Sequence, residues 1–543
     1  MNKQSLHRKS RLFFAAVLAA GFATNLNAQD GSSNFHFVPN SLVLARSVYL
    51  GDASTVVVGE TLPLNCVAGN VSVPLIAGGV VEVAVTCGIA TADGTFPGVF
   101  NNASSDGSFG ITSPIFIDNL NTNGHVLGTL TIPSDQIVTS FSSKSELALH
   151  RSVDGKSLTF MAYVGGPGNP TGPNLLDVSA SNTPGVIDPT NPSVGQYYRS
   201  VAEVDGSGHL TITFGNAYSG DNGRAVIKGG NGFYYMTGND NSGNLSKAQL
   251  STTQVGVNLV NSTGAEMLIP GQTPPLPPNI AMVGKFSIAN LGYAKDKPGK
   301  DTNYRGITIF NNTLYFTKGS GGNGINTVYQ AGTSGTLPTG VAADLLKTPT
   351  TILPGFPTVL ASGVALDGSA NNPVAYPFGI WFANANTLYV CDEGDGALVS
   401  PPVNGNVASA YSQATGGVQK WSLVDGTWQL DYILNTGLNI GVPYGVTNYP
   451  AAINPATGGC RHLTGSINGD GTVTLYATTS TISLSGDQGA DPNQLVRVTD
   501  MLGNTTLPLP GRSRNGAKLG VFTILRTAQS GEVFRGLDWA PAE

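Results

Sequence analysis

Charged side chains are scarce in this chain, and long apolar runs are missing from it. Charged residues make up 11% of the 543 residues, where an ordinary soluble protein has roughly 25%. No apolar run reaches the roughly 18 residues that a membrane-spanning helix needs, so we expect no membrane span in the mature chain. Acidic residues outnumber basic ones by 33 to 27, which argues against the basic surface that nucleic-acid binding requires.

Cysteines and nucleophile motifs are also sparse. The four cysteines fit no zinc-binding spacing such as C-x₂-C, and the G-x-S-x-G motif of serine hydrolases is absent. Cys66 and Cys87 flank a short apolar stretch, and we predict that they form a disulfide in an exported protein. A bridge between Cys391 and Cys460 requires their strands to be neighbours, which the sequence leaves open.

The first 28 residues have the three parts of a secretory signal peptide. Four basic residues precede the eleven apolar residues at 12–22, and Leu26-Asn27-Ala28 offers a cleavage site before Gln29. Eleven apolar residues are too few to span a bilayer. Cleavage would leave 23 basic and 33 acidic residues, a net charge of −10. We therefore expect a secreted or periplasmic protein.

Glycine is what the chain has in excess. Its 71 glycines are about 13% of the residues, against a usual share of roughly 7%, and they follow no three-residue period, which excludes collagen. Residues 304–321 and 377–394 each read as strand, turn, strand and Gly-rich loop, and both contain Asn-Thr-Leu-Tyr. Further copies begin near residues 145, 223, 443 and 534. This degenerate repeat predicts an all-β fold.

Second strand pairs lie between these hairpins, so the repeating unit is four antiparallel strands. Such a unit predicts a β-propeller, because radial repetition leaves few exposed sheet edges. Six inner strands are recognisable, and seven blades are the alternative. The last copy, residues 534–543, has no partners after it, whereas strands expected at 41–50, 114–119 and 124–133 have none before them. We expect the N- and C-terminal strands to pair and close the ring.

The predicted organisation is a signal peptide at 1–28 and one β-propeller domain at 29–543, with an insertion at about 51–113. A parallel β-helix would show shorter periods, and tandem β-sandwiches would not leave the last hairpin without its second half. The strand–turn–strand copies resemble those of NHL-type and SMP-30 (gluconolactonase)-type propellers. This resemblance covers about residues 140–543 and implies a six-bladed propeller.

The inner strands of a propeller begin at one mouth of its central channel. The equivalent start positions of the six copies are Glu146, Arg224, Arg305, Phe378, Tyr444 and Arg535. Arginine presents a planar fork of donors that suits a carboxylate or a phosphate, so three arginines at the mouth predict a site for a small polar or anionic ligand. Alternatively, each arginine pairs with a carboxylate of a neighbouring blade and holds the blades together.

A candidate metal site follows the second strand of the 377–394 copy. Asp392 and Glu393 begin an acidic, Gly-rich loop, and Ca²⁺ takes six to eight oxygen ligands from carboxylates, carbonyls and water. The loop lacks the ligand order of an EF-hand. The resemblance to gluconolactonase implies a divalent ion held by scattered Glu, Asn and Asp, but no pattern here matches those ligands. Calcium is a candidate cofactor because of the two carboxylates, Asp392 and Glu393, at the start of this loop.

Three classes of function are compatible with these features. The leading hypothesis is a monomeric, exported binding or recognition protein, whose partner is a small ligand or a cell-envelope or extracellular macromolecule. The second is a metal-assisted lactonase, lyase or hydrolase, for which no catalytic residue can be named. The third is a structural or adhesive envelope protein. Unpaired carboxylates close together at the mouth would favour the enzyme, whereas arginines paired within the wall would favour a structural role.

Overall fold

The structure is a computed structural model of the 543-residue chain. The residues that it describes are 35–49, 112–141, 143–164, 198–215, 217–218, 222–239, 303–319, 324–339, 348–361, 375–408, 415–485, 489–509 and 512–542, with short segments at 59, 61–62, 69–74, 80–85, 88–89, 258–261 and 284–285.

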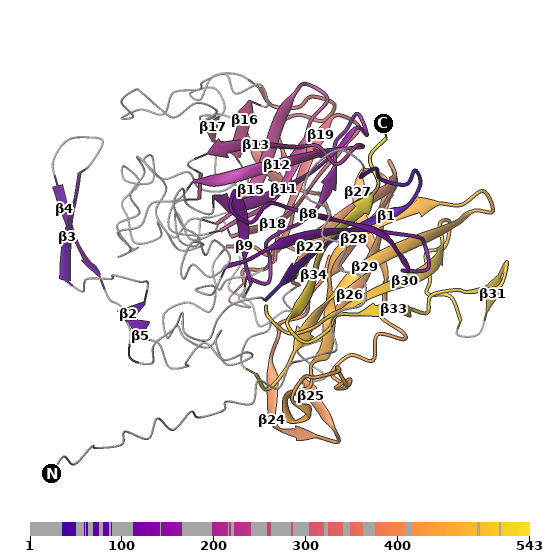
Figure 1. Ribbon diagram of the computed structural model, residues 1–543. Helices are drawn as coiled ribbons and strands as arrows, with labels where there is room; N and C mark the ends of the chain where they lie inside the picture. The colour runs from indigo at the N-terminus through magenta and orange to yellow at the C-terminus, as the bar shows by residue number, and fades with distance from the viewer. Residues whose placement is uncertain are drawn as a thin grey trace, which may run out of the picture.

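The described chain is almost entirely β-structure and forms a β-propeller (Figure 1). Five of its antiparallel sheets have four strands each. Each sheet is given below from its innermost strand outward, and the innermost strands of neighbouring sheets contact one another. These sheets are β34–β1–β7–β8 (Glu532–Trp539, Leu42–Val48, Ile115–Leu120, Val126–Thr131), β14–β15–β16–β17 (Gly223–Lys228, Phe233–Gly238, Asn258–Asn261, Gly284–Lys285), β18–β19–β20–β21 (Tyr304–Phe310, Thr313–Lys318, Thr327–Ala331, Thr350–Ile352), β22–β23–β26–β27 (Pro377–Asn384, Thr387–Asp392, Gly417–Val424, Thr427–Leu434) and β28–β29–β30–β33 (Ala456–Ile467, Thr472–Ile482, Gln494–Met501, Thr523–Thr527).

A larger sheet departs from this four-stranded form. It consists of β13 (Leu210–Gly215), β12 (Arg199–Asp205), β11 (Ser157–Val164), β9 (Ile137–Ser140) and β6 (Thr112–Ser113), with β10 (His150–Arg151) also paired to β11. Both β9 and β10 pair with the edge of β11 that faces away from β12. The position of an innermost strand is therefore shared by two short strands, and residues 141–149 leave the sheet between them. The predicted count of six or seven four-stranded blades is not confirmed.

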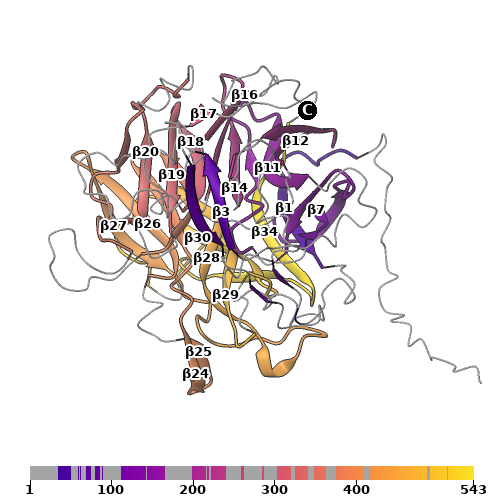
Figure 2. The ribbon, with the colours of Figure 1, turned by 90° about the vertical axis from the view of Figure 1, so that its left-hand side faces the viewer.

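The two ends of the described chain meet in one sheet, as the sequence predicts. In the antiparallel pair of β1 with β34, Leu42 lies opposite Trp539 and Ser47 lies opposite Val533. β7 pairs with the other edge of β1, and β8 pairs with β7. Figures 1 and 2 show the indigo β1 beside the yellow β34. The last inner strand thus takes its three partners from the N-terminal part of the chain.

Among the described residues, four two-stranded antiparallel sheets are separate from these larger sheets. They are β2 with β5 (Thr61–Leu62, Gly88–Ile89), β3 with β4 (Gly69–Pro74, Val80–Val85), β24 with β25 (Leu398–Val403, Asn406–Ala408) and β31 with β32 (Ser513–Arg514, Ala517–Lys518). One short 3₁₀-helix, Ala451–Ile453, is found in the described segments. None of their helices is long and apolar enough to cross a membrane.

Neighbouring inner strands approach one another so closely that only glycine fits at several positions. A Cβ on Gly306 would lie 2.1 Å from the carbonyl oxygen of Phe378, and a Cβ on Gly536 would lie 1.9 Å from the amide nitrogen of Leu149. Threonines of the second strands fix the same contacts, since Thr317 Oγ1 donates to the carbonyl of Phe378 at 2.6 Å. The repeated Gly and Thr of the hairpins therefore hold one sheet against the next.

The apolar core lies between the faces of adjacent sheets. One cluster joins Ile307 and Phe316 of one sheet to Ile380 and Phe382 of the next. Phe310 stacks on Phe382 with ring centroids 4.7 Å apart. Ile380 and Phe382 are alternate residues of β22, as expected where one face of a strand points toward a neighbouring sheet. This packing fixes where the first residues of each inner strand lie.

Candidate functional site

Residues 143–146 pass the beginnings of the inner strands. They belong to the segment that leaves the large sheet between β9 and β10, and Leu147 directly after them has a positive φ of 62°. Such a backbone angle is strained for a bulky residue, and strain of this kind persists only where the surroundings impose it. Leu147 is fully buried, and its carbonyl accepts the amide of Gly536 at 2.9 Å. The interruption of the inner strand thus places the polar segment 143–146 among charged side chains that come from other sheets.

Seven charged side chains gather around this segment, and we refer to them as the inner cluster: Lys144, Glu146, Arg224, Arg305, Glu393, Arg461 and Arg535. They come from the large sheet and from all five four-stranded sheets. Five are cationic and two are carboxylates. All but Lys144 are buried.

Glu393 lies between two cations of the inner cluster. Its Oε1 accepts a hydrogen bond from Lys144 Nζ at 2.7 Å, and its Oε2 accepts one from Arg461 Nε at 3.0 Å. Burial alone would raise the pKa of this carboxyl, but Lys144, Arg461 and Arg305 outweigh it and lower the pKa to about 2. Glu393 is therefore ionised at every physiological pH and serves as the counter-ion of the cluster.

Lys144 is the partly accessible member of the inner cluster. Its side chain is 32% exposed, whereas that of Glu393 is 2% exposed. Loss of hydration lowers the pKa of Lys144; Glu393 opposes this effect, and Arg461 and Arg305 add to it. Tyr376 is half-buried nearby, and burial followed by the charges of Asp395, Asp392 and Glu393 raises its pKa to about 12. An ammonium group and a neutral phenol are thus accessible at this end of the inner strands.

The three arginines predicted from the sequence hold main-chain and hydroxyl groups. Arg535 donates from Nε to Ser47 Oγ at 3.1 Å, and its two terminal nitrogens donate to the carbonyls of Ser143 and Phe141. Arg305 donates to Ser145 Oγ. These contacts fasten the segment before β10 to two other sheets.

Arg305 and Arg224 have further contacts in the wall. The Arg305 guanidinium carbon lies 5.5 Å from the centroid of the Phe378 ring, within the range of a cation–π contact. Arg224 donates to Asn303 Oδ1 and, at 2.9 Å, to the carbonyl of Tyr304. Arg224 therefore links β14 to β18, the inner strand of the next sheet.

Glu146 lies in the inner cluster but turns toward neutral donors. Its Oε2 accepts hydrogen bonds from Thr139 Oγ1 and from the backbone amide of Ser140, each at 3.0 Å. Its Oε1 accepts hydrogen bonds from the hydroxyl of Tyr163 and from the side-chain amide of Asn222. Glu146 precedes β10 and is not part of an inner strand, contrary to the expectation from the repeat. Its contacts fix the polar segment in place.

Asp392 and Glu393 point in different directions despite being adjacent. Asp392 accepts the amides of Tyr376 and Gly394, each at 2.9 Å, and Gln419 Nε2 at 3.0 Å. Burial raises the pKa of Asp392 to about 7. Asp392 closes the end of its own sheet, and Glu393 is engaged by two cations. Across the described segments, no group of three or more His, Cys, Asp or Glu side chains could hold a metal ion.

The fifth repeat begins later than the sequence analysis placed it. Tyr444 is not on an inner strand; the inner strand is β28, and the residue in the position of Phe378 is Arg461. A Cβ on Gly379 would lie 2.9 Å from the carbonyl oxygen of Arg461, just as a Cβ on Gly306 would meet that of Phe378. Counting back from the turn at Asn468–Gly471 would have found Arg461. Lys144 carries no such signal, because the segment that holds it follows no repeat.

Two histidines lie behind the arginines. His462 is buried on β28 and packs edge-on against Phe378, with ring centroids 5.6 Å apart. Burial and the charges of His150, Arg461 and Arg535 lower the pKa of His462 well below its ordinary value, and burial lowers that of His150 to about 4. Both imidazoles are therefore neutral at pH 7, as expected for packed histidines.

The predicted disulfide partners Cys66 and Cys87 lie outside the described residues. Cys391 and Cys460 are both described; they are buried and carry free thiols.

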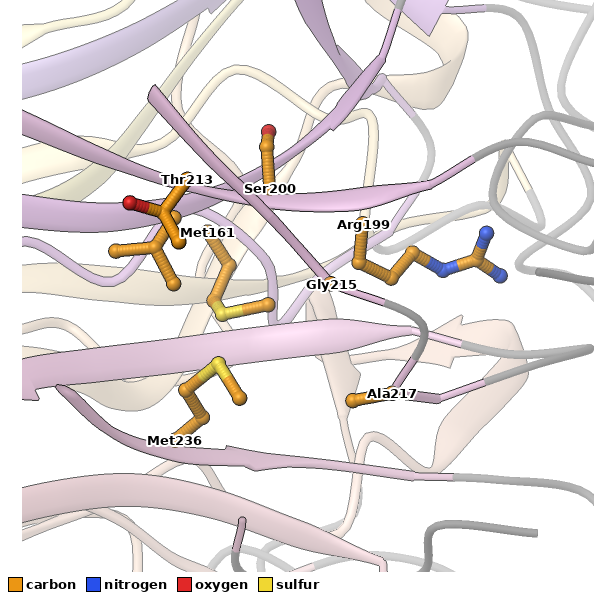
Figure 3. Close-up of a pocket in the computed structure, with 8 residues that line it drawn as sticks. Met161, Arg199, Ser200, Thr213, Gly215, Ala217 and Met236 are labelled. Carbon is orange, nitrogen blue, oxygen red and sulfur yellow. The ribbon is translucent and has the colours of Figure 1, made fainter. Parts of the chain in front are cut away.

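An apolar pocket lies apart from the inner cluster (Figure 3). It opens between the large sheet and the sheet of β14 and β15, and none of the residues that line it belongs to the inner cluster. The lining residues are Met161, Arg199, Ser200, Val201, Thr213, Gly215, Ala217 and Met236. Figure 3 shows the two methionines facing each other from different strands.

No family model matches the chain, and no curated protein is similar to it in sequence. Two solved structures are similar to it in fold over most of its length. One is the extracellular domain of a hybrid two-component system from B. thetaiotaomicron, with a TM-score of 0.27 and 9% identity, covering 87% of this chain and 53% of that one. The chain thus spans about half the length of that structure.

The other is the haemagglutinin-neuraminidase of parainfluenza virus 5 with the ligand DANA, with a TM-score of 0.27 and 9% identity, covering 91% of this chain and 98% of that one. Similarities of this extent identify neither a family nor a ligand for this chain.

Proposed function

We propose that this protein is an exported recognition protein that binds a small carboxylate-bearing ligand at the inner cluster. The observation that carries the proposal is the presence of Lys144 and four buried arginines in the inner cluster, where Glu393 is the carboxylate that forms ion pairs with two of these cations, in a chain whose net charge is −6. Buried charges are costly unless they are paired. The arginines hold main-chain and hydroxyl groups of the wall, but the five cations outnumber the two carboxylates of the inner cluster, which leaves an excess of positive charge there.

Three titratable groups are affected by the cations of the inner cluster. Against the effect of burial, Lys144, Arg461 and Arg305 lower the pKa of Glu393 to about 2. Burial is the main cause that lowers the pKa of Lys144 and of His462; Arg461 and Arg305 add to it at Lys144, and His150, Arg461 and Arg535 add to it at His462. A region of positive potential attracts anions. The same field that acts on these groups would act on a ligand carboxylate.

Lys144 and Tyr376 are the groups that such a ligand would reach first. Lys144 is partly exposed and bound to Glu393, so a ligand carboxylate would compete with Glu393 for the ammonium group. Tyr376 offers an aromatic ring and a hydroxyl group near Glu393, the partner of Lys144. A charged group together with an aromatic wall suits a small organic acid such as a sugar acid.

The organisation of the chain completes this proposal. Residues 1–28 act as a signal peptide, and residues 29–543 form one monomeric propeller domain with an insertion at about 51–113. The large sheet acts as its sixth blade, because the inner strands contact one another in the order β10, β14, β18, β22, β28 and β34, and β34 returns to β10. The bonds of Asp392 and Glu393 give no support to a metal-assisted enzyme.

Binding can be tested by thermal unfolding of the protein with increasing concentrations of gluconate, glucuronate, acetate and phosphate, and with glucose as a neutral control. A ligand of the native state raises the unfolding midpoint by mass action. We expect a rise with at least one carboxylate, and at least a tenfold weaker Kd for Lys144→Gln. Lys156→Gln is the matched control, because Lys156 is exposed on a turn between β10 and β11.

Two outcomes would overturn the proposal. One is the absence of any midpoint shift with the organic acids. The other is a carboxylate that binds wild type and Lys144→Gln equally well. A rise with Ca²⁺ that EDTA reverses would instead support the metal-dependent alternative.

A further inference from the structure

Cys391 and Cys460 lie on strands of two neighbouring sheets that pack against each other. Cys391 is on β23 and Cys460 is on β28, the inner strand of the next sheet, and both side chains are fully buried in one apolar cluster. Burial raises the pKa of the Cys391 thiol, and Cys460 adds to this effect. Both are free thiols in this structure.

The main chains on either side of the two cysteines touch. A Cβ on Gly459, just before Cys460, would lie 2.1 Å from the carbonyl oxygen of Asp392, just after Cys391. The absence of a side chain at Gly459 therefore brings the two strands together at this point. A disulfide requires Cα atoms within about 7 Å, and the close contact between Gly459 and Asp392, the neighbours of the two cysteines, brings the strands together at this point.

We propose that Cys391 and Cys460 form a disulfide in the exported protein, which joins two neighbouring sheets directly behind the ion pair of Glu393 and Arg461. The oxidant is the disulfide of a dithiol oxidoreductase or of oxidised glutathione. One cysteine thiolate attacks the oxidant's disulfide, forms a mixed disulfide and releases one thiolate. The second cysteine thiolate then attacks the mixed disulfide, forms the Cys391–Cys460 bond and releases the other thiolate. The protein loses two electrons and two protons, and the oxidant gains them.

The bridge forms before the two sheets pack. In the folded protein neither thiol is exposed, and burial raises the pKa of Cys391 well above its ordinary value. Because the thiolate is the reactive form, such a pair reacts slowly with any oxidant or reductant in solution. The bridge, once formed, is shielded from reductants until the protein unfolds.

The position of the bridge connects it to the inner cluster. Arg461 follows Cys460 directly, and Glu393 comes two residues after Cys391, so the disulfide fixes the two strands that carry this ion pair. The proposal concerns the state of the thiols and holds whether or not a carboxylate binds.

The test compares full-length protein exported to an oxidising compartment with protein made in a reducing cytosol. Both samples are denatured in N-ethylmaleimide, digested with trypsin without reduction and analysed by mass spectrometry. Trypsin cleaves after Lys420, so the proposed bridge links peptides 348–420 and 421–461. A bridge between Cys66 and Cys87 would stay within the single peptide 47–144 and is therefore distinguishable.

We expect linked 348–420 and 421–461 in the exported sample and alkylated thiols in the cytosolic one. The exported protein should also unfold several degrees higher, and a Cys391→Ala/Cys460→Ala variant should lose this difference, while Cys66→Ser/Cys87→Ser should keep it. Alkylation of both Cys391 and Cys460 in the exported protein would overturn the proposal, as would linkage of either to Cys66 or Cys87.

Discussion

Lys144 and Glu393 are 249 residues apart in the chain, and their Nζ and Oε1 atoms are 2.7 Å apart. Lys144 lies between β9 and β10, and Glu393 follows β23, so the ion pair joins two sheets that do not adjoin in the ring. Arg461 shares the same carboxylate. If the proposed ligand binds at Lys144, folding and binding depend on the same charges, because a carboxylate that takes Lys144 must replace Glu393 as its counter-ion.

The ion pairs of Glu393 predict a loss of stability in acid. The folded pKa of Glu393 is about 2, below the ordinary value of 4.5. The stabilisation is therefore complete above about pH 5 and is lost as the pH falls toward 2, and it amounts to on the order of 3 kcal/mol. Urea unfolding at pH 7, 5, 4 and 3 should show that Glu393→Gln is less stable than wild type at pH 7 and that the difference shrinks in acid.

Asp392 acts in the opposite sense, because its folded pKa is raised to about 7 and its contribution falls as the pH rises from about 4 to 7. Comparing wild type with Glu393→Gln at each pH removes the part of this contribution that comes from burial, which is its largest cause; Glu393 adds a smaller part. Asp425→Asn, an exposed turn residue with a positive φ that Asn tolerates, is the control. A difference between wild type and Glu393→Gln that does not change with pH would contradict the role given to Glu393.

The close approach of the inner strands predicts that Gly306→Ala is strongly destabilising. Its Cβ would lie 2.1 Å from the carbonyl oxygen of Phe378, so the backbone of one sheet must move. Overpacking of this kind costs about 1–3 kcal/mol or more. In urea unfolding, the midpoint of Gly306→Ala should fall, while Gly503→Ala, whose Cβ meets nothing within 4 Å, should leave it unchanged. Equal midpoints for the two variants would show that the strands can separate without cost.

A buried lysine between two other sheets gives the next prediction. Lys420 Nζ lies 3.4 Å from Asp500 Oδ2 and donates to the carbonyls of Met501, Leu502 and Asn504. Lys420→Met leaves the buried Asp500 without its cation, which costs about 3–5 kcal/mol. Thermal unfolding should show this loss for Lys420→Met and no loss for Lys156→Met, whose side chain is exposed.

A double-mutant cycle separates the charge from the packing of Lys420. Tyr389 and Tyr432 also donate to Asp500, so Asp500→Asn keeps part of the hydrogen bonding. The loss in Lys420→Met/Asp500→Asn should be smaller than the sum of the two single losses. Additive losses would mean that the two charges do not interact.

Much of the fold could be predicted because its signals are local. Alternation, Asn-Gly and Asp-Gly turns and the repeated Asn-Thr-Leu-Tyr predict the hairpins, and the unpartnered last copy predicts that β34 pairs with β1. The hairpins β10–β11 and β12–β13 of the large sheet follow the same signals. The part of this sheet formed by β9 and β6 could not be predicted, because the inner strand is split by an excursion that tertiary contacts hold in place. Only two residues of that strand, His150 and Arg151, remain in the sheet as β10.

Some residues of the inner cluster could be named from the sequence for the same reason. Arg224, Arg305 and Arg535 occupy equivalent positions of the repeat, on the inner strands β14, β18 and β34. Lys144 was missed because it lies on the excursion, and Arg461 because a long loop shifted the start of the fifth copy. Residues that follow the repeat can be found by counting, whereas those that depend on how loops cross the inner strands cannot.

The pairing of the terminal strands predicts that the last ten residues are required for the whole propeller. Removing 534–543 deletes most of β34, the hydrogen bonds of Arg535 to the chain at Phe141 and Ser143, and the buried Phe534 and Leu537. β1 would then expose an unpaired edge. We expect loss of the cooperative thermal transition or a fall of more than ten degrees in its midpoint. Removing only 541–543, after β34 has ended, should change the midpoint little, since among the described residues of that tail Ala542 contributes one backbone hydrogen bond, to Gly155. Equal midpoints for the longer truncation and wild type would refute closure of the ring through its termini.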